Sequence, residues 1–329
     1  MRGVGAGRSA QRGTSGATTG PRGARSAPPN PDKALARSAP PNPYSLLNVI
    51  LPGMATNVEF EVDVKDVEYQ RLGDEPWLAR VYRPVGTGPF PTVLDVHGGA
   101  WNKGDRTNDT LMNRGLAAQG ILTVAIDFRQ PPQAGYPASV QDMNLGIRWL
   151  KVHAAEYGGT AQVGALGISS GGHLVLLGGI RPRDTRYSAL PLAGHPEVDA
   201  SLAYVIACWP VSDPLYRYQL ARQAGNQSLV TSHDNYWGTE AAMSEGSPPL
   251  ILERGEPVDL PPTLVIQRAV DGVHPLEMQQ RLVDWYQRRG GQIEMPLYAS
   301  LPSPFSLSPE YPDGQRVIDK IAEFIKRHG

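Results

Sequence analysis

The stretch 163–177 limits the possible folds of this chain more than any other. An apolar, strand-like run leads into Gly167-Ile-Ser-Ser-Gly171, and a helix-like run follows it. A serine held on a tight strand-to-helix turn points its hydroxyl out of the sheet edge, and the flanking glycines let strand and helix approach without clashing β-carbons. The pattern therefore predicts Ser169 as a nucleophile. A five-residue motif is weak by itself, so it needs partners elsewhere in the chain.

The size and composition allow one large α/β core or two smaller ones. The chain has 329 residues, of which 40% are hydrophobic, and its single cysteine is Cys208. One cysteine cannot form an intrachain disulfide, which fits a reducing compartment, although a disulfide-free protein can also be exported. We therefore expect a cytoplasmic location and a buried, structural Cys208, since its neighbours are apolar.

The charge distribution is uneven and argues against two classes of partner. Residues 1–43 carry seven basic residues and one acid, whereas the rest carries 24 basic against 31 acidic residues. A mildly acidic body has no nucleic-acid footprint. The longest apolar region, 164–180, is interrupted by two serines, a histidine and six glycines. It is therefore expected to form the turn around Ser169 and not a membrane span. The sequence does not predict an oligomeric state.

Residues 1–43 are expected to form a disordered tail. They hold seven glycines and seven prolines, and the octapeptide at 24–31 recurs at 36–43. Such a segment cannot bury enough apolar surface to offset the entropy of ordering. A tolerated linker or a wrongly assigned start codon is one interpretation. Five arginines before Asp32 favour a targeting peptide instead, but the glycine and proline content opposes the amphipathic helix that such peptides form.

The remainder, 44–329, is expected to be one domain in which strands and helices alternate. That alternation, after two leading antiparallel strands at a sheet edge, predicts a mostly parallel sheet covered by helices on both faces. Segments 44–55 and 210–260 lie outside this pattern and are candidates for a cap. We expect strands at 58–64, 77–82, 91–96, 121–126, 163–168, 201–207, 262–266 and 292–298, and helices at 107–119, 137–157, 276–289 and 318–327.

The motif His97-Gly98-Gly99 is the first candidate partner of Ser169. Two glycines at the carboxyl end of a strand leave backbone N–H groups free to approach a ligand. Together with the N–H of Ser170, they would supply three convergent donors to an oxyanion. The alternative is that Gly98-Gly99 forms only a turn, but two motifs that belong to the same chemistry support each other.

Asp271 is the second candidate partner. It follows the strand at 262–266, so it is expected at the same end of the sheet as Ser169. A carboxylate there can orient an imidazole and stabilise its protonated form. A solvated loop aspartate is the alternative interpretation.

Taken together, the motifs resemble the hormone-sensitive-lipase-like branch of the α/β-hydrolases, esterases with an H-G-G motif upstream of G-x-S-x-G-G. The resemblance covers roughly residues 55 to 328. It implies an α/β-hydrolase fold, a cap above Ser169, and a cofactor-free hydrolase of a carboxylic ester or related acyl bond in a small molecule. It is carried by His97-Gly-Gly-Ala-Trp101, Asp127-Phe-Arg129, Tyr136-Pro-Ala138 with Asp142, Gly167-Ile-Ser-Ser-Gly-Gly172, and Pro261-Pro262 leading to Asp271-Gly-Val-His-Pro275.

The chain departs from the family pattern at the expected base. The resemblance implies a histidine about 30 residues after the acid. Ser303 stands at that position, Ser300 where a glycine is usual, and Arg268 where the family tends to have a glycine. A serine hydroxyl cannot accept a proton usefully at neutral pH. Without a base, Ser169 would retain a rate enhancement on the order of 10³–10⁴ over water, from the oxyanion hole and binding alone.

Other histidines are weaker candidates for the base. His274 is nearest in sequence to Asp271, but the similar Val-His-Pro segment of the family leads away into a helix, so we expect it to lie apart from Ser169. His173 is expected to face the core one helical turn after Ser169. His97 is expected to shape the oxyanion loop. The remaining histidines carry no signal: His153, His195, His233 and His328.

Two functional hypotheses remain open. The first is a serine carboxylesterase-like hydrolase, and the alternative is a non-catalytic small-molecule receptor or pseudoenzyme on the same fold. Plant gibberellin receptors are similar to this family and also lack the histidine; an engineered or erroneous Ser303 is a third possibility. Metal and nucleotide cofactors have no supporting motif. Four aromatic residues are candidates either for a substrate pocket or for core packing: Trp101, Tyr216, Tyr236 and Trp237.

Overall fold

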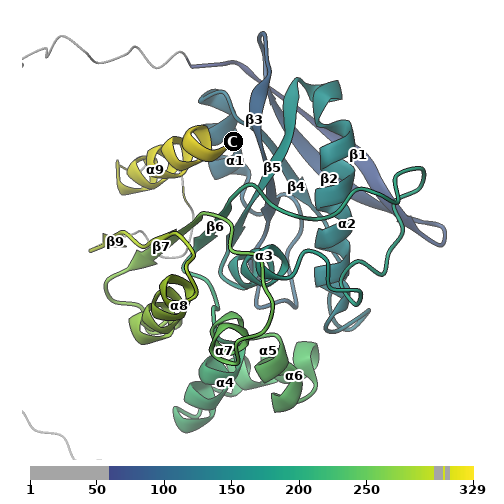
Figure 1. Ribbon diagram of the computed structural model, residues 1–329. Coiled ribbons are helices and arrows are strands. Elements are labelled where there is room, and N and C mark those ends of the chain that lie inside the picture. Colours follow the sequence, from purple (N-terminus) through teal and green to yellow (C-terminus); the bar gives the residue numbers. More distant parts are fainter. Residues whose placement is uncertain (1–58, 300–306, 308–311) are drawn as a thin grey trace, which may run out of the picture. The chain divides into compact units, whose positions relative to one another are not determined.

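The computed structural model of the protein describes residues 59–299, 307 and 312–329 (Figure 1). The predictions for the tail at 1–43 and for a cap segment at 44–55 lie outside these residues. Ser300 and Ser303 lie outside them too. The domain boundary at residue 44 therefore stays a prediction.

A nine-stranded sheet lies at the centre of the described chain (Figure 1). Its order is β1-β2-β4-β3-β5-β6-β7-β8, and β9 also pairs with β7. β1 and β2 pair antiparallel, β2 pairs antiparallel with β4, and the remaining pairs are parallel. The strands are β1 (Val62–Leu72), β2 (Glu75–Pro84), β3 (Phe90–Val96), β4 (Leu122–Ile126), β5 (Gly159–Ile168), β6 (Val205–Cys208), β7 (Thr263–Arg268), β8 (Ile293–Glu294) and β9 (Leu297–Tyr298).

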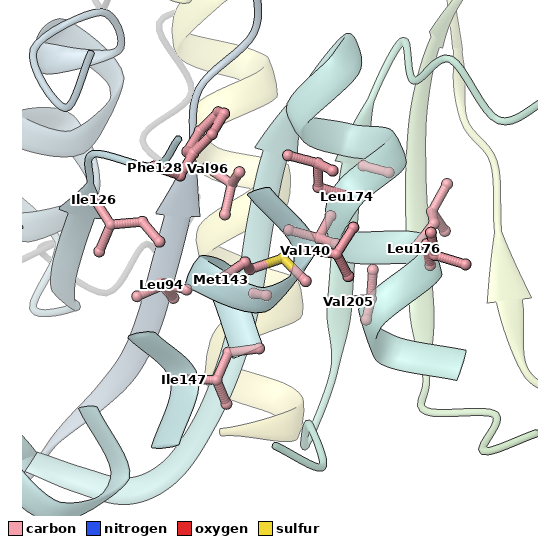
Figure 2. Packing of buried hydrophobic residues seen from close by; sticks show 14 of the residues in the cluster. Leu94, Val96, Ile126, Phe128, Val140, Met143, Ile147, Leu174, Leu176 and Val205 are labelled. Carbon is pink, nitrogen blue, oxygen red and sulfur yellow. The ribbon is translucent and has the colours of Figure 1, made fainter. Parts of the chain in front are cut away.

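Helices cover both faces of the sheet, as the alternating pattern predicts. α1 (Thr110–Ala118) and α9 (Pro312–His328) share one apolar cluster with side chains of the central strands. α2 (Ala138–His153), α3 (Ser170–Ile180) and α8 (Leu276–Arg288) contribute to a second cluster on the other face. Figure 2 shows the α2 and α3 part of that cluster, where Met143 lies among Leu94, Val140 and Leu174. The sheet is therefore buried on both sides, which explains its continuous apolar strands.

Residues 210–260 form helices and add no strand to the sheet. They contain α4 (Pro214–Gln223), α5 (Gln227–Trp237), α6 (Glu240–Glu245) and α7 (Pro248–Glu253), which gather together at the bottom of the view in Figure 1. α4 follows β6 after the five residues 209–213, and the Asp213 side chain accepts a hydrogen bond from the Tyr216 N–H as its N-cap. None of the helices in the described ranges is long and apolar enough to span a bilayer.

Several predicted elements differ in extent from the structure, and three of these differences have a clear physical reason. β1 runs to Leu72 and not to residue 64, because a bulge between Glu68 and Gln70 breaks its alternation. The strand expected at 292–298 is divided into β8 and β9 on either side of Met295-Pro296, since a proline donates no ladder hydrogen bond. α9 begins six residues before the predicted start, at Pro312, a residue that the first turn of a helix tolerates.

Two acids lie close together at the end of β3 and the start of α1: Asp95 is buried and Asp109 is partly buried. Asp95, 1% exposed, accepts a hydrogen bond of 2.7 Å from the Asn113 side chain, while its Oδ1 has no partner in the described part of the chain. Burial raises the pKa of Asp95 and also that of Asp109, whose pKa the Asp95 charge raises further. The two carboxyl groups therefore resist being ionised together.

The Asp95→Asn variant should raise thermal stability more at high pH than at low pH. The raised pKa means that the stability contribution of protonated Asp95 is complete below about pH 3.9 and is lost as pH rises through the folded-state pKa. An amide keeps the Asn113 contact and cannot ionise. We expect a gain in Tm of several degrees at pH 8 and a smaller one at pH 5, measured by calorimetry. The exposed Asp74→Asn is the matched control, and an equal gain at both pH values would contradict the prediction.

Candidate active site

The turn around Ser169 has the strained geometry that its sequence predicts. Ser169 follows β5 and caps α3 with φ 56° and ψ −114°, a conformation that non-glycine residues rarely adopt. A β-carbon on Gly167 would lie 2.4 Å from the Gly171 carbonyl oxygen, and one on Gly171 would lie 1.9 Å from the Val96 oxygen. Both glycines are therefore required by close backbone approach.

The loop after β3 lies beside Ser169. A β-carbon on Gly98 would be 3.4 Å from the Ser169 β-carbon. Gly99 has φ +121°, and a β-carbon there would meet the Lys103 carbonyl oxygen at 1.9 Å. The Trp101 N–H donates to Ser170 Oγ over 3.1 Å, so the loop is tied to the first turn of α3. The H-G-G motif and the serine turn are thus brought together.

His97 stabilises this loop through its imidazole ring. Its Nδ1 donates to the Gly98 carbonyl over 2.7 Å, and its ring stacks on Phe128 with 4.2 Å between centroids. Burial lowers the pKa of His97, which keeps the imidazole neutral. The contact fits the expected role of shaping the loop and gives His97 no contact with Ser169 Oγ.

His274 is the imidazole that faces Ser169. Its Nε2 lies 3.0 Å from Ser169 Oγ, and its Nδ1 lies 3.3 Å from Oδ2 of Asp271. The expectation that this histidine would lead away from the site is therefore wrong. A neutral imidazole that donates Nδ1–H to Asp271 leaves Nε2 free to accept the serine proton.

His274 is positioned by a tight turn in which one carboxylate oxygen of Asp271 accepts two backbone N–H groups. Asp271 Oδ1 accepts the backbone N–H groups of Val273 and His274, each over 2.8 Å. This side-chain turn folds the chain so that the residue three positions after the aspartate returns to its carboxylate. Gln267, buried on β7, donates to the His274 carbonyl over 2.9 Å and fixes the far end of the turn.

Arg268 and His274 contact the same carboxylate oxygen of Asp271. Its Nε and Nη2 donate to Asp271 Oδ2 over 3.0 and 2.5 Å, the same oxygen that faces His274 Nδ1. Burial would raise the pKa of Asp271, but the hydrogen bonds and charge of His274 outweigh it and hold that pKa well below the usual range. Burial lowers the pKa of His274, a change that the bond to Asp271 opposes. Near neutral pH the pair is therefore carboxylate and neutral imidazole.

The aromatic residues named from the sequence pack on one another. Trp101 is 1% exposed and stacks on Tyr236 with 5.2 Å between ring centroids, and Trp237 meets it edge-on. His173 accepts the Trp101 indole N–H over 3.3 Å and donates to the Gly246 carbonyl. For three of the four aromatic candidates, core packing is thus the interpretation that fits, and only Tyr216 is partly exposed.

The other histidines and Ser303 take no part in the described contact between Ser169 and His274. Ser303 is outside the described residues, and His173 is buried in the core as expected. His233 is buried in α5. His153, His195 and His328 are partly exposed. Among residues 59–299, 307 and 312–329, no three His, Cys, Asp or Glu side chains gather as a metal-binding group would require.

The spacing Asp271-x-x-His274 was the available sequence signal for the imidazole. An aspartate often accepts N–H groups two and three residues further on, and that turn carries the later side chain back toward it. The expectation about His274 followed the family pattern instead. Asp127, Arg129 and Asp142 were noted only as motif residues. In the structure they form ion pairs: Arg129 donates to Asp142, and Arg106 donates to Asp127.

Comparisons with known proteins agree with this architecture. The family model BD-FAE matches residues 80–286, a span that includes the H-G-G loop, the serine turn and the Asp271–His274 turn. The fold is shared with esterase B of Lactobacillus rhamnosis, with a TM-score of 0.67 and 22% identity over 80% of this chain and 87% of that one.

Two curated relatives come from Mycobacterium tuberculosis. The probable carboxylic ester hydrolase LipM is 28% identical over 251 residues, and the esterase LipC is 36% identical over 135 residues. These matches cover 72% and 39% of this chain, but only 54% and 33% of the relatives' own lengths. The protein belongs to the BD-FAE family, has the α/β-hydrolase fold, and resembles the hormone-sensitive-lipase-like esterases as its motifs predict.

Proposed function

We propose that the protein is a serine hydrolase that cleaves a carboxylic ester, or a related acyl bond, of a small molecule. Ser169 is the nucleophile, His274 the base and Asp271 the acid that orients it. The N–H groups of Gly98, Gly99 and Ser170 bind the oxyanion. The observation that carries the proposal is the 3.0 Å contact between Ser169 Oγ and His274 Nε2, with Asp271 behind the imidazole.

Acylation follows from this arrangement. The Ser169 hydroxyl passes its proton to His274 Nε2 as Oγ attacks the acyl carbon, and the carbonyl oxygen becomes an oxyanion within reach of the loop N–H groups. Asp271 stabilises the resulting imidazolium through Nδ1. When the tetrahedral intermediate collapses, the imidazolium returns the proton to the departing alcohol, and an acyl ester of Ser169 remains.

Deacylation repeats the same proton transfers with water. His274 Nε2 takes a proton from a water molecule as its oxygen attacks the acyl-serine carbon, and the imidazolium then protonates Ser169 Oγ. The carboxylic acid leaves. Apart from the ester and water, each half-reaction uses only groups of this chain.

The receptor or pseudoenzyme alternative was based on Ser303, which stands where the family has its catalytic histidine. A base is missing only if it must lie at residue 303, and His274 provides an imidazole next to Ser169. The names of the curated relatives, a carboxylic ester hydrolase and an esterase, add support for catalysis. No observation in the described residues favours a binding-only role.

A fluorophosphonate probe should label Ser169, because it reports the nucleophile without knowledge of the substrate. Mass spectrometry should place the adduct on Ser169 and find none in Ser169→Ala. His274→Gln should slow both labelling and the hydrolysis of 4-nitrophenyl butyrate by about 10³-fold or more, since loss of a triad member has effects of this order.

Ser303→Ala is the matched control and should leave both rates within about twofold, since this serine is not assigned as the base. A large loss in Ser303→Ala together with an unchanged His274→Gln would contradict the assignment of the base. Ser303→His should give no large gain if the site is already complete.

The pH profile of kcat/KM for 4-nitrophenyl butyrate should rise to its plateau early. Activity requires neutral His274, and its pKa is lowered from 6.5 by burial despite the bond to Asp271. The midpoint of the acidic limb should therefore lie below pH 6.5. Stopped-assay rates between pH 4.5 and 8.5 would measure it, and a midpoint above pH 7 would contradict a buried His274 base.

A further inference from the structure

Arg217 is a buried cation that the proposed chemistry does not use. It lies on α4 and is 2% exposed. Its guanidinium lies over the Trp101 ring, 5.2 Å from the centroid, and its Nε donates to His233 Nε2 over 3.4 Å. Burial, with the charge of Arg217, lowers the pKa of His233 to about 3, so this neighbour stays neutral and brings no counter-charge.

The charge of Arg217 is not neutralised within the described part of the chain. No carboxylate there forms an ion pair with it, and its buried Nη2 has no hydrogen-bond partner. The carboxylate whose charge acts on Arg217 is Asp271, but Arg268 already holds that group through two N–H donors. A buried charge that lacks a partner is strongly unfavourable, so it indicates a missing anion.

Arg217 is also close to the reaction centre. The Trp101 ring on which it packs belongs to the residue whose N–H bonds Ser170 Oγ, next to Ser169. The positive charge of Arg217 also contributes, after burial, to the lowered pKa of His274. Arg217 and Arg268 are cationic, Asp271 is anionic and His274 is neutral, so these four groups carry one net positive charge.

We propose that Arg217 selects esters that carry a carboxylate, which would accept its Nη2–H. This inference rests on the proposed function and names the class of substrate for that same site. A planar guanidinium matches the two oxygens of a carboxylate, and a charge-assisted bond of this kind is stronger than one between neutral groups. A neutral ester would leave the Arg217 charge unpaired.

Matched ester pairs test the proposal on each side of the scissile bond. For the alcohol side, 4-carboxyphenyl butyrate is compared with 4-carbamoylphenyl butyrate. For the acyl side, the mono-4-nitrophenyl ester of adipic acid is compared with its terminal amide. The carboxylate member of at least one pair should have the higher kcat/KM, by about tenfold or more, because bonds to charged groups have effects of this size. The pair that shows it identifies the side of the substrate that carries the anion.

Arg217→Gln should abolish that preference, and Arg217→Lys should keep part of it because the charge remains. The ratio within a pair is the decisive quantity, since a defect in folding or in Ser169 lowers both members equally. Arg222→Gln is the matched control: it lies on the same helix, is exposed, and pairs with Glu240. Its ratio should equal that of the unmodified protein.

Two results would overturn the inference alone: equal turnover of both members of each pair, or a preference that survives Arg217→Gln. Absence of turnover for all four esters, together with absence of fluorophosphonate labelling at Ser169, would overturn the proposed function and the inference with it. Labelling and turnover of the amide esters separate the two cases.

Discussion

The close backbone approach at Gly171 is the contact on which the rest of the site depends. The first turn of α3 can lie against the end of β3 only because this residue has no side chain. The approach places the Ser169 turn beside Gly98, and the Trp101 N–H then bonds Ser170. Ser169 and the H-G-G loop are therefore held by one packing constraint, with the strained φ of Ser169 maintained by the strand and helix on either side.

The helices between β6 and β7 are joined to the site through aromatic packing. Trp101, at the end of the H-G-G loop, stacks on Tyr236 and meets Trp237 edge-on, both from α5. Arg217 of α4 lies over the same indole. A shift of α4 or α5 would therefore displace Trp101 and, with it, the loop that we propose as the oxyanion hole. The insertion also brings a charge into the interior that the sheet and its covering helices do not neutralise.

Much of the fold follows from the sequence, because buried parallel strands are continuous apolar runs and the helices between them have a clear apolar face. The edge strand β1 was harder, since a half-exposed, bulged strand loses its alternation at Glu68. For the site, the motif alone explains the glycines around Ser169, because a tight strand-to-helix turn leaves no room for side chains there. His274 was missed because its position depends on a side-chain turn at Asp271. Arg217 had no local signal, since its surroundings come from three distant segments.

The Asp271 turn carries both the proposed acid and the proposed base, and this has a mechanical consequence. The two groups are three residues apart and joined by bonds from Asp271 to the His274 backbone and ring. A displacement of the loop after β7 would therefore carry Asp271 and His274 away from Ser169 together. The contact of His274 with Ser169 would be lost, while the contacts between Asp271 and His274 would be kept.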